Sequence, residues 1–222
     1  MAFCGSRRCR PLVALDIETY SPDGFPSAFE DPIVNVSLAI HDGIGLRIVS
    51  LAYPPERELT LLRFLSAELA GLKGLLLTYN GTRFDLPYLG RRCALNGLGF
   101  ELGRLEHLDL YWMARREIPG LASYSQSSVE RALGIDRLSG HIHGGVYHEH
   151  FDKFLEDGSP DPIVYNIEDS LGCLRIFKGI VAQGGRGGSV RAAWKVLNIF
   201  KEQNTQDSYG RSLCLDPLRS PG

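Results

Sequence analysis

The stretch that most restricts the fold is residues 11–19, PLVALDIET, where an apolar run suddenly carries two carboxylates. A run rich in Leu, Val and Ile is typical of a buried strand. Because strand side chains alternate between faces, Asp16 and Glu18 project from the same side of the sheet. A break of this kind in an apolar pattern usually marks function. The two carboxylates form half of a site for a divalent cation, although a pair of solvated acids at a strand end is the alternative.

Composition places the chain among ordinary globular proteins. It has 222 residues, of which 44% are apolar and 23% charged, which predicts one domain with a short appendage. The formal charge of −2 gives no general attraction to nucleic acid or anionic membrane, so such binding needs a local patch or a metal. No apolar run approaches the roughly 18 residues of a bilayer span, and five cysteines without a CxxC pair favour reduced thiols. We therefore expect a cytoplasmic protein without membrane contact.

The order of elements indicates an α/β fold. Two more strand-like runs follow the first and are joined by a tight hairpin at 41–43, which predicts an antiparallel meander. Helices and strands then alternate, and the remainder is helical. The expected strands are 11–19, 33–40, 44–52, 75–80 and 105–111, and the expected helices are 56–72, 86–96, 124–133, 149–155 and 161–183.

The chain divides into three parts by composition. Residues 1–10 form a short N-terminal extension, and residues 11–183 form the folded domain. From 184 to 222 the chain begins with a Gly-rich joint, followed by helical spacing at 189–203 that could dock on the domain. The last residues, from about 204, are polar and contain Pro and Gly, so we expect a poorly ordered tail.

Three further side chains fit with the first carboxylate pair. Asp85 follows the strand 75–80 at its carboxyl end, where α/β sheets usually build sites, although Asp is also a common helix N-cap. Tyr165 and Asp169 lie in the long helix, and their spacing of four puts the phenol and the carboxylate on one helical face.

In order and spacing, these motifs resemble those of the DEDD superfamily of 3′→5′ exonucleases, whose ribonuclease-H-like domain also proofreads in family B DNA polymerases. LDIET matches the first motif, Asn80, Phe84 and Asp85 match the second, and Tyr165 with Asp169 matches the third. One branch of the superfamily has Tyr four residues before the last aspartate, and Tyr165 fits this branch. HLDLYWMARRE and SSVERALGI are similar to stand-alone YprB-like proteins, so the resemblance covers roughly residues 11–182.

The resemblance implies a ribonuclease-H-like fold with a central mixed five-stranded sheet, an antiparallel meander followed by parallel strands, flanked by helices. It also implies catalysis with two divalent cations, Mg²⁺ or Mn²⁺, which prefer oxygen ligands and stabilise the attacking and departing oxygens. Asp16 would bridge the ions, Glu18 and Asp169 would hold the ion that activates water, and Asp85 would support the second ion. Tyr165 would orient the attacking water.

Residues near the motifs are candidates for substrate binding. Arg91 and Arg92, and further along Arg115 and Arg116, could reach phosphates, although solvated helix faces are the alternative. Aromatic side chains beside the motifs could stack on unpaired bases. Asp109 could support the site or make a structural hydrogen bond. The substrate-binding candidates are Thr19, Tyr20, Asn80, Phe84, Arg91 and Arg92.

The expected substrate is a single-stranded 3′ end, with DNA favoured. An exoribonuclease acting on RNA ends and a nucleic-acid-binding adaptor that does not cleave are the alternatives, and a replication or repair protein is a candidate partner. The loop HIHGGVYHEH adds four histidines that this chemistry does not need; they could bind zinc or nickel, or be solvated imidazoles.

Overall fold

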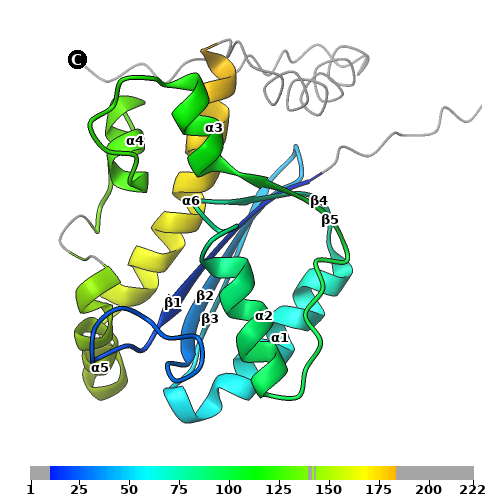
Figure 1. Ribbon diagram of the computed structural model, residues 1–222, viewed down its shortest axis with the longest axis vertical. Helices are drawn as coiled ribbons and strands as arrows, with labels where there is room; N and C mark the ends of the chain where they lie inside the picture. The colour runs from blue at the N-terminus through cyan, green and yellow to red at the C-terminus, as the bar shows by residue number, and fades with distance from the viewer. Residues whose placement is uncertain (1–10, 140–141, 143, 184–222) are drawn as a thin grey trace, which may run out of the picture.

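The computed structural model describes residues 11–139, 142 and 144–183. Five strands form one sheet in the order β3-β2-β1-β4-β5 (Figure 1). The first three strands are antiparallel neighbours, whereas β4 and β5 run parallel to β1. The predicted α/β class and the mixed five-stranded sheet are therefore confirmed. The strands are β1 Leu12–Thr19, β2 Ile33–His41, β3 Leu46–Ala52, β4 Lys73–Thr78 and β5 Arg104–Asp109.

Helices cover both faces of the sheet (Figure 1). One apolar core lies between the sheet and α1 with α2, and a second lies between the sheet and α3, α4 and α6. A smaller cluster joins α5 to β2. The helices are α1 Glu58–Gly71, α2 Asp85–Leu95, α3 Leu110–Glu117, α4 Gln126–Ala132, α5 Tyr147–Asp157 and α6 Asp161–Ala182, with short 3₁₀ turns at Pro55–Arg57 and Gly144–Val146.

The central strand β1 shows why the carboxylates point where they do. Successive side chains enter opposite cores, with Ala14 under α6 and Leu15 under α1 and α2. Asp16 and Glu18 continue the face of Ala14, so both carboxylates project toward α6. The alternation that buries the strand on both sides therefore also aims its two charges at one helix.

One element differs from the sequence expectation. The run 105–111 is not one strand, because β5 ends at Asp109 and α3 begins at Leu110. The Asp109 carboxylate accepts a hydrogen bond from the Tyr111 backbone N–H, which starts the helix as an N-cap, and Arg115 and Arg116 in the last turn complement the helix dipole. The leucines Leu105, Leu108 and Leu110 continue across the boundary, so the apolar content of the sequence does not mark this switch from strand to helix.

Two parts of the sequence interpretation concern residues outside the described ones. The N-terminal extension 1–10, the Gly-rich joint, the helix expected at 189–203 and the tail all lie there.

In the described part of the chain, no helix is long and apolar enough to span a bilayer. Cys93 and Cys173 are buried free thiols.

Gly74 is a glycine of the described chain whose replacement should cost much stability. Its φ is +144°, and an added Cβ would lie 2.1 Å from the backbone oxygen of Pro11, which accepts a hydrogen bond from Leu75 N–H. We expect Gly74→Ala to lower the free energy of unfolding by about 2–4 kcal/mol in urea titrations. Gly71→Ala is the matched control, since nothing lies within 4 Å of its added Cβ. Equal urea midpoints for the two variants would contradict this account.

Candidate active site

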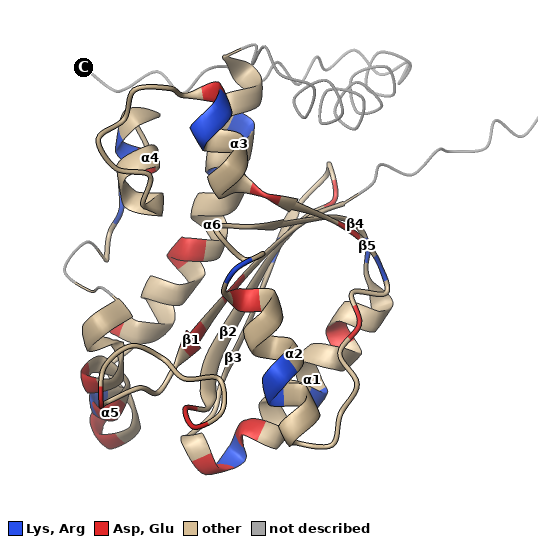
Figure 2. Cartoon of the chain, viewed as in Figure 1, with Lys and Arg blue, Asp and Glu red and all other residues tan. Residues whose placement is uncertain are grey.

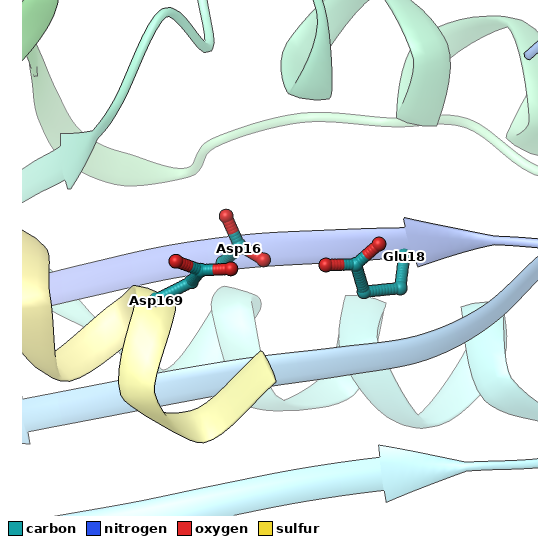
Figure 3. Close-up of side chains that lie close together, drawn as sticks. All are labelled: Asp16, Glu18 and Asp169. Atoms are coloured by element: carbon teal, nitrogen blue, oxygen red, sulfur yellow. The ribbon is translucent and has the colours of Figure 1, made fainter. Parts of the chain in front are cut away.

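Three carboxylates converge where β1 meets α6. One oxygen each from Asp16, Glu18 and Asp169 lies within 4.8 Å of the others (Figure 3). Asp16 and Glu18 come from one face of β1, and Asp169 reaches them from α6. Figure 2 shows acidic positions on β1, at the start of α2 and on α6 around this part of the molecule. Three hard oxygen donors in one place suit a divalent cation such as Mg²⁺ or Mn²⁺.

The helix α6 is fixed to the sheet by Asn166, which the sequence analysis did not single out. Its Nδ2 donates to the Asp16 Oδ2 at 2.7 Å, and its backbone oxygen accepts from Ser37 Oγ at 2.7 Å. Asn166 is fully buried, and its Oδ1 has no hydrogen-bond partner in the described part of the chain. Asn166 therefore sets the orientation of Asp16, and its place in the motif YNIED was the signal that could have revealed it.

Asp85 reaches the site from the neighbouring strand's end. Strands β1 and β4 are paired only from Leu12 with Leu75 to Ala14 with Leu77, and beyond that they separate. The Asp85 Oδ1 then accepts the free N–H of Ile17 at 3.3 Å. Asp85 is the first residue of α2 rather than its N-cap, which is Phe84. Its carboxylate lies beside the three converging ones without joining their group.

Burial and mutual repulsion raise the pKa values of the four carboxyl groups. Burial, followed by the charges of Asp169 and Asp85, raises the pKa of Asp16 and of Glu18 well above the ordinary values. Burial also raises the pKa of Asp85 to about 7, and it raises that of Asp169 to about 6 against the opposing effect of Arg137. Because the ionised carboxylates repel one another, a cation bound among them would stabilise their charged form.

A cation of the chain itself, Arg137, sits at one end of the cluster. Its guanidinium forms ion pairs with Asp169 and with Glu130 of α4, which is 1% exposed. Gln126, on the same helix, donates from Nε2 to the Asp169 backbone oxygen at 2.8 Å. Neither residue was assigned a role from the sequence, because Glu130 lies within the quoted segment SSVERALGI and Arg137 just after it, and no spacing links either to Asp169. Together they tie α4 and the following loop to α6.

The loop that carries Arg137 is held by a second acidic residue of α6. The Glu168 carboxylate accepts the backbone N–H groups of Leu138 at 2.8 Å and of Ser139 at 2.7 Å. These hydrogen bonds, together with the Ser139 hydroxyl, lower the pKa of Glu168 against the effect of burial. Glu168 and Asp169 are adjacent in sequence, so one fixes the position of the loop and the other binds its arginine.

Tyr165 lies one helical turn before Asp169. Its ring is 6.1 Å from that of Tyr147, and the guanidinium carbon of Arg137 is 5.9 Å from its centroid. Burial, then the charges of Asp169 and Glu18, raise the pKa of Tyr165 far above its ordinary value. The phenol is therefore protonated at neutral pH and can donate a hydrogen bond beside the carboxylates.

The loop from Asn80 to Phe84 forms another wall of the site. Asn80 has a φ of +62°, a conformation that Asn tolerates better than most residues. The Asp109 carboxylate accepts the N–H groups of Asn80 and Thr82 at 2.9 and 3.0 Å. Of the two alternatives for Asp109, the structure supports the structural one, because this residue shapes the loop and caps α3.

A cavity of about 810 Å³ extends over the cluster. It is lined by the four carboxylates, Tyr165, Asn80 and Phe84, which the sequence analysis had brought forward. Ile17, Tyr79 and residues of α3, α4 and the loop between these helices line the rest. The cavity therefore brings together seven of the residues that the motifs had identified.

The remaining substrate-binding candidates lie elsewhere. The prediction that Arg92 binds phosphate is wrong. Arg92 is only 9% exposed and forms a bidentate ion pair with Glu58, with hydrogen bonds of 2.8 and 2.6 Å. Arg91 is exposed, and its guanidinium carbon lies 4.5 Å from the ring centroid of Phe29. Neither Arg91 nor Arg92 lines the cavity, whereas Arg115 does. Adjacent helix residues point about 100° apart, and in α2 this turns Arg92 toward Glu58 of α1 while Arg91 faces solvent.

Thr19 and Tyr20 follow the carboxylates on β1 but do not line the cavity either. Thr19 is buried and shares a 2.9 Å hydrogen bond with Ser21. The Tyr20 hydroxyl donates to Asp152 at 3.3 Å, and its ring lies 6.3 Å from that of His148. Among the described residues no histidine joins a group with metal-binding geometry. His141 and His143 lie outside the described residues.

Comparison with known proteins shows similarity to the RNase H superfamily and to DNA polymerases. A family model described as the RNase_H superfamily matches residues 13–180. A DNA polymerase of Thermococcus kodakarensis is 34% identical over 149 residues, a match that covers 55% of this chain and 9% of the polymerase. A DNA polymerase of a Desulfurococcus species is 30% identical over 196 residues, covering 75% of this chain and 24% of the polymerase.

A solved structure shows the same fold. The family B DNA polymerase of Pyrobaculum calidifontis superimposes with a TM-score of 0.68 at 20% identity, over 78% of this chain and 24% of that one. The chain thus spans between 9% and 24% of the length of these polymerases.

Proposed function

The chain belongs to the RNase H superfamily, and from this membership we propose that it is a metal-dependent 3′→5′ exonuclease of the DEDD type, tyrosine branch. The single observation that carries the proposal is the convergence of Asp16, Glu18 and Asp169 on one point, with Asp85 beside them. The similarity to DNA polymerases supports it.

The donor set fits two divalent cations, Mg²⁺ or Mn²⁺. Asp16, Glu18 and Asp169 would hold one ion, and Asp16 with Asp85 would hold the second. Bound there, such ions neutralise the carboxylates and stabilise the charge that develops on the attacking and departing oxygens of a phosphodiester. The cavity above the cluster leaves room for the end of a nucleic-acid strand.

Tyr165 and Arg137 would complete the chemistry from the side of the protein. With its raised pKa, the Tyr165 phenol keeps its proton and orients the attacking water by hydrogen bonding instead of removing a proton from it. Arg137 keeps Asp169 in place through their ion pair. Both residues act by positioning, and neither needs to change its protonation state.

Replacing Tyr165 by Phe keeps the ring and removes only the hydroxyl. We expect kcat on single-stranded DNA to fall by about tenfold to a hundredfold, because the water loses its orienting partner, while Mn²⁺ affinity by calorimetry stays near wild type. Tyr53→Phe is the matched control, since that ring stacks on Phe64 and does not line the cavity. A wild-type kcat for Tyr165→Phe would exclude the water-orienting role.

The proposed substrate is an unpaired 3′ end, with DNA favoured by the similarity to DNA polymerases. RNA ends remain the second candidate substrate. A replication or repair protein would be a fitting partner, because removal of terminal nucleotides serves those processes.

The function is tested with 5′-labelled DNA and RNA oligomers of one sequence, incubated with Mg²⁺, Mn²⁺ or EDTA. We expect a ladder of products that shortens from the 3′ end, requires the metal and forms faster on DNA. A faster ladder on RNA would reassign the substrate. Binding of either polymer without any cleavage in the presence of metal would identify an adaptor module and reject the exonuclease.

A further inference from the structure

The cavity also includes a group of side chains outside the three motifs that carry the carboxylates and Tyr165. This group consists of Tyr79 just after β4, Tyr111 and Arg115 of α3, and Tyr124 before α4. We call these four residues the Arg115 arm. Figure 2 shows Lys or Arg positions on α3, on the side of the sheet that α6 also covers. One continuous cavity therefore contains both the acidic cluster and a cation.

Arg115 is held between aromatic rings. Its Nη1 donates to the Tyr111 hydroxyl at 2.9 Å, and its guanidinium carbon lies 5.7 Å from the Tyr111 centroid and 5.3 Å from that of Tyr124. Within the described chain no carboxylate forms an ion pair with it. An exposed guanidinium without an acidic partner keeps donors available for an anion.

The rings around Arg115 are themselves fixed. The Tyr79 hydroxyl donates to the Tyr124 backbone oxygen at 2.6 Å, and the Tyr124 hydroxyl donates to the Ile118 oxygen at 2.8 Å. Tyr79 and Tyr111 meet edge to face with their centroids 6.3 Å apart. A cation presented on rigid aromatic surfaces matches a nucleotide, which offers a phosphate and a base that can stack.

We propose that the Arg115 arm binds the nucleotide on the 5′ side of the bond being cut, through its phosphate and base. This inference rests on the exonuclease function proposed above. A strand cut at its last phosphodiester has no further phosphate on the 3′ side. The second phosphate that Arg115 can bind is therefore the one on the 5′ side. The arm makes the site selective for a polynucleotide over a single phosphodiester.

The neighbouring arginines provide controls for this role. Arg116 follows Arg115 directly, but it pairs with Glu117 at 2.8 Å and does not line the cavity. Arg91 stacks on Phe29 beyond the cavity. Removing either charge changes the total charge of the protein as much as removing that of Arg115. Only Arg115 is placed to contact the strand.

The experiment compares Arg115→Gln, Arg116→Gln and wild type on two substrates with Mn²⁺. One is a single-stranded DNA oligomer, and the other is thymidine 5′-p-nitrophenyl phosphate, which has no nucleotide on the 5′ side. We expect Arg115→Gln to raise KM for the oligomer about tenfold or more and to leave hydrolysis of the nitrophenyl ester unchanged. Arg116→Gln should match wild type on both substrates.

Binding of the same fluorescent oligomer in EDTA, followed by anisotropy, gives a readout that does not need cleavage. Arg115→Gln should weaken binding by a similar factor and reduce the slope of log affinity against log salt by about one. Equal binding by the Arg115 and Arg116 variants, or equal loss on both substrates, would overturn the proposal. Absence of cleavage by wild type would reject the exonuclease, and the binding comparison would still decide the role of Arg115.

Discussion

Asp16→Asn is expected to abolish hydrolysis and at the same time to make the metal-free protein more stable. The substitution removes the charge of a carboxylate that would hold both ions, so we expect kcat to fall by a factor on the order of 10³ or more. Burial of this carboxylate, followed by the charges of Asp169, Asp85 and Glu18, raises its pKa. Its removal relieves repulsion, and the amide oxygen can still accept from Asn166.

A variant that is inactive but more stable separates a functional role from a structural one. Thermal unfolding in EDTA and initial rates with Mn²⁺ on single-stranded DNA measure the two effects. Asp23→Asn is the control, because it removes an exposed charge outside the cavity. Wild-type rates for Asp16→Asn would show that the site is assigned to the wrong residues.

The stabilisation of the protein by metal should depend steeply on pH. In the folded protein the pKa of Asp169 is about 6 and that of Asp85 about 7, above the ordinary value of 3.8. Between about pH 4 and 7 the folded state binds more protons than the unfolded state, so the metal-free protein loses stability as pH rises through this window. A metal needs the ionised carboxylates, so its stabilising effect grows over the same range.

The metal concentration is the same at every pH and is about a hundred times the dissociation constant at pH 8. We then expect the unfolding temperature to rise by roughly 5–10 °C at pH 8 and much less at pH 5.5. The measurement is thermal unfolding with Mn²⁺ or EDTA across pH. The double variant Asp16→Asn/Glu18→Gln is the control, since it keeps the ion pair of Asp169 with Arg137. A shift that is equal at both pH values, or that persists in the double variant, would contradict the account.

The placements that could be predicted from sequence are those of residues whose spacing is set by a local period. The alternation of a strand places Asp16 and Glu18 on one face, and the turn of a helix places Tyr165 below Asp169. The order of strands and helices likewise indicated the sheet, because apolar periodicity was clear in β1, β2 and α1. Local pattern was sufficient wherever the contact is made within one element.

The residues that escaped prediction act between elements. Arg137 and Glu130 meet Asp169 only because α4 packs on α6, where Gly172 leaves room: an added Cβ would lie 2.0 Å from the Glu130 Oε1. Arg92 was misassigned for the same reason, since its partner Glu58 comes from another helix. No period within one segment encodes such pairs, so they become visible only in three dimensions.

The most direct test of the central claim is to locate the metal. Crystals grown with Mn²⁺ give an anomalous difference map in which bound manganese is distinguished from the light atoms of the protein and from water. The account predicts a peak within coordination distance of Asp16, Glu18 and Asp169, and its loss in Asp16→Asn crystals grown in the same way. Saturating Mn²⁺ with no peak among these carboxylates, or with peaks only elsewhere on the protein, would contradict the assignment of the site.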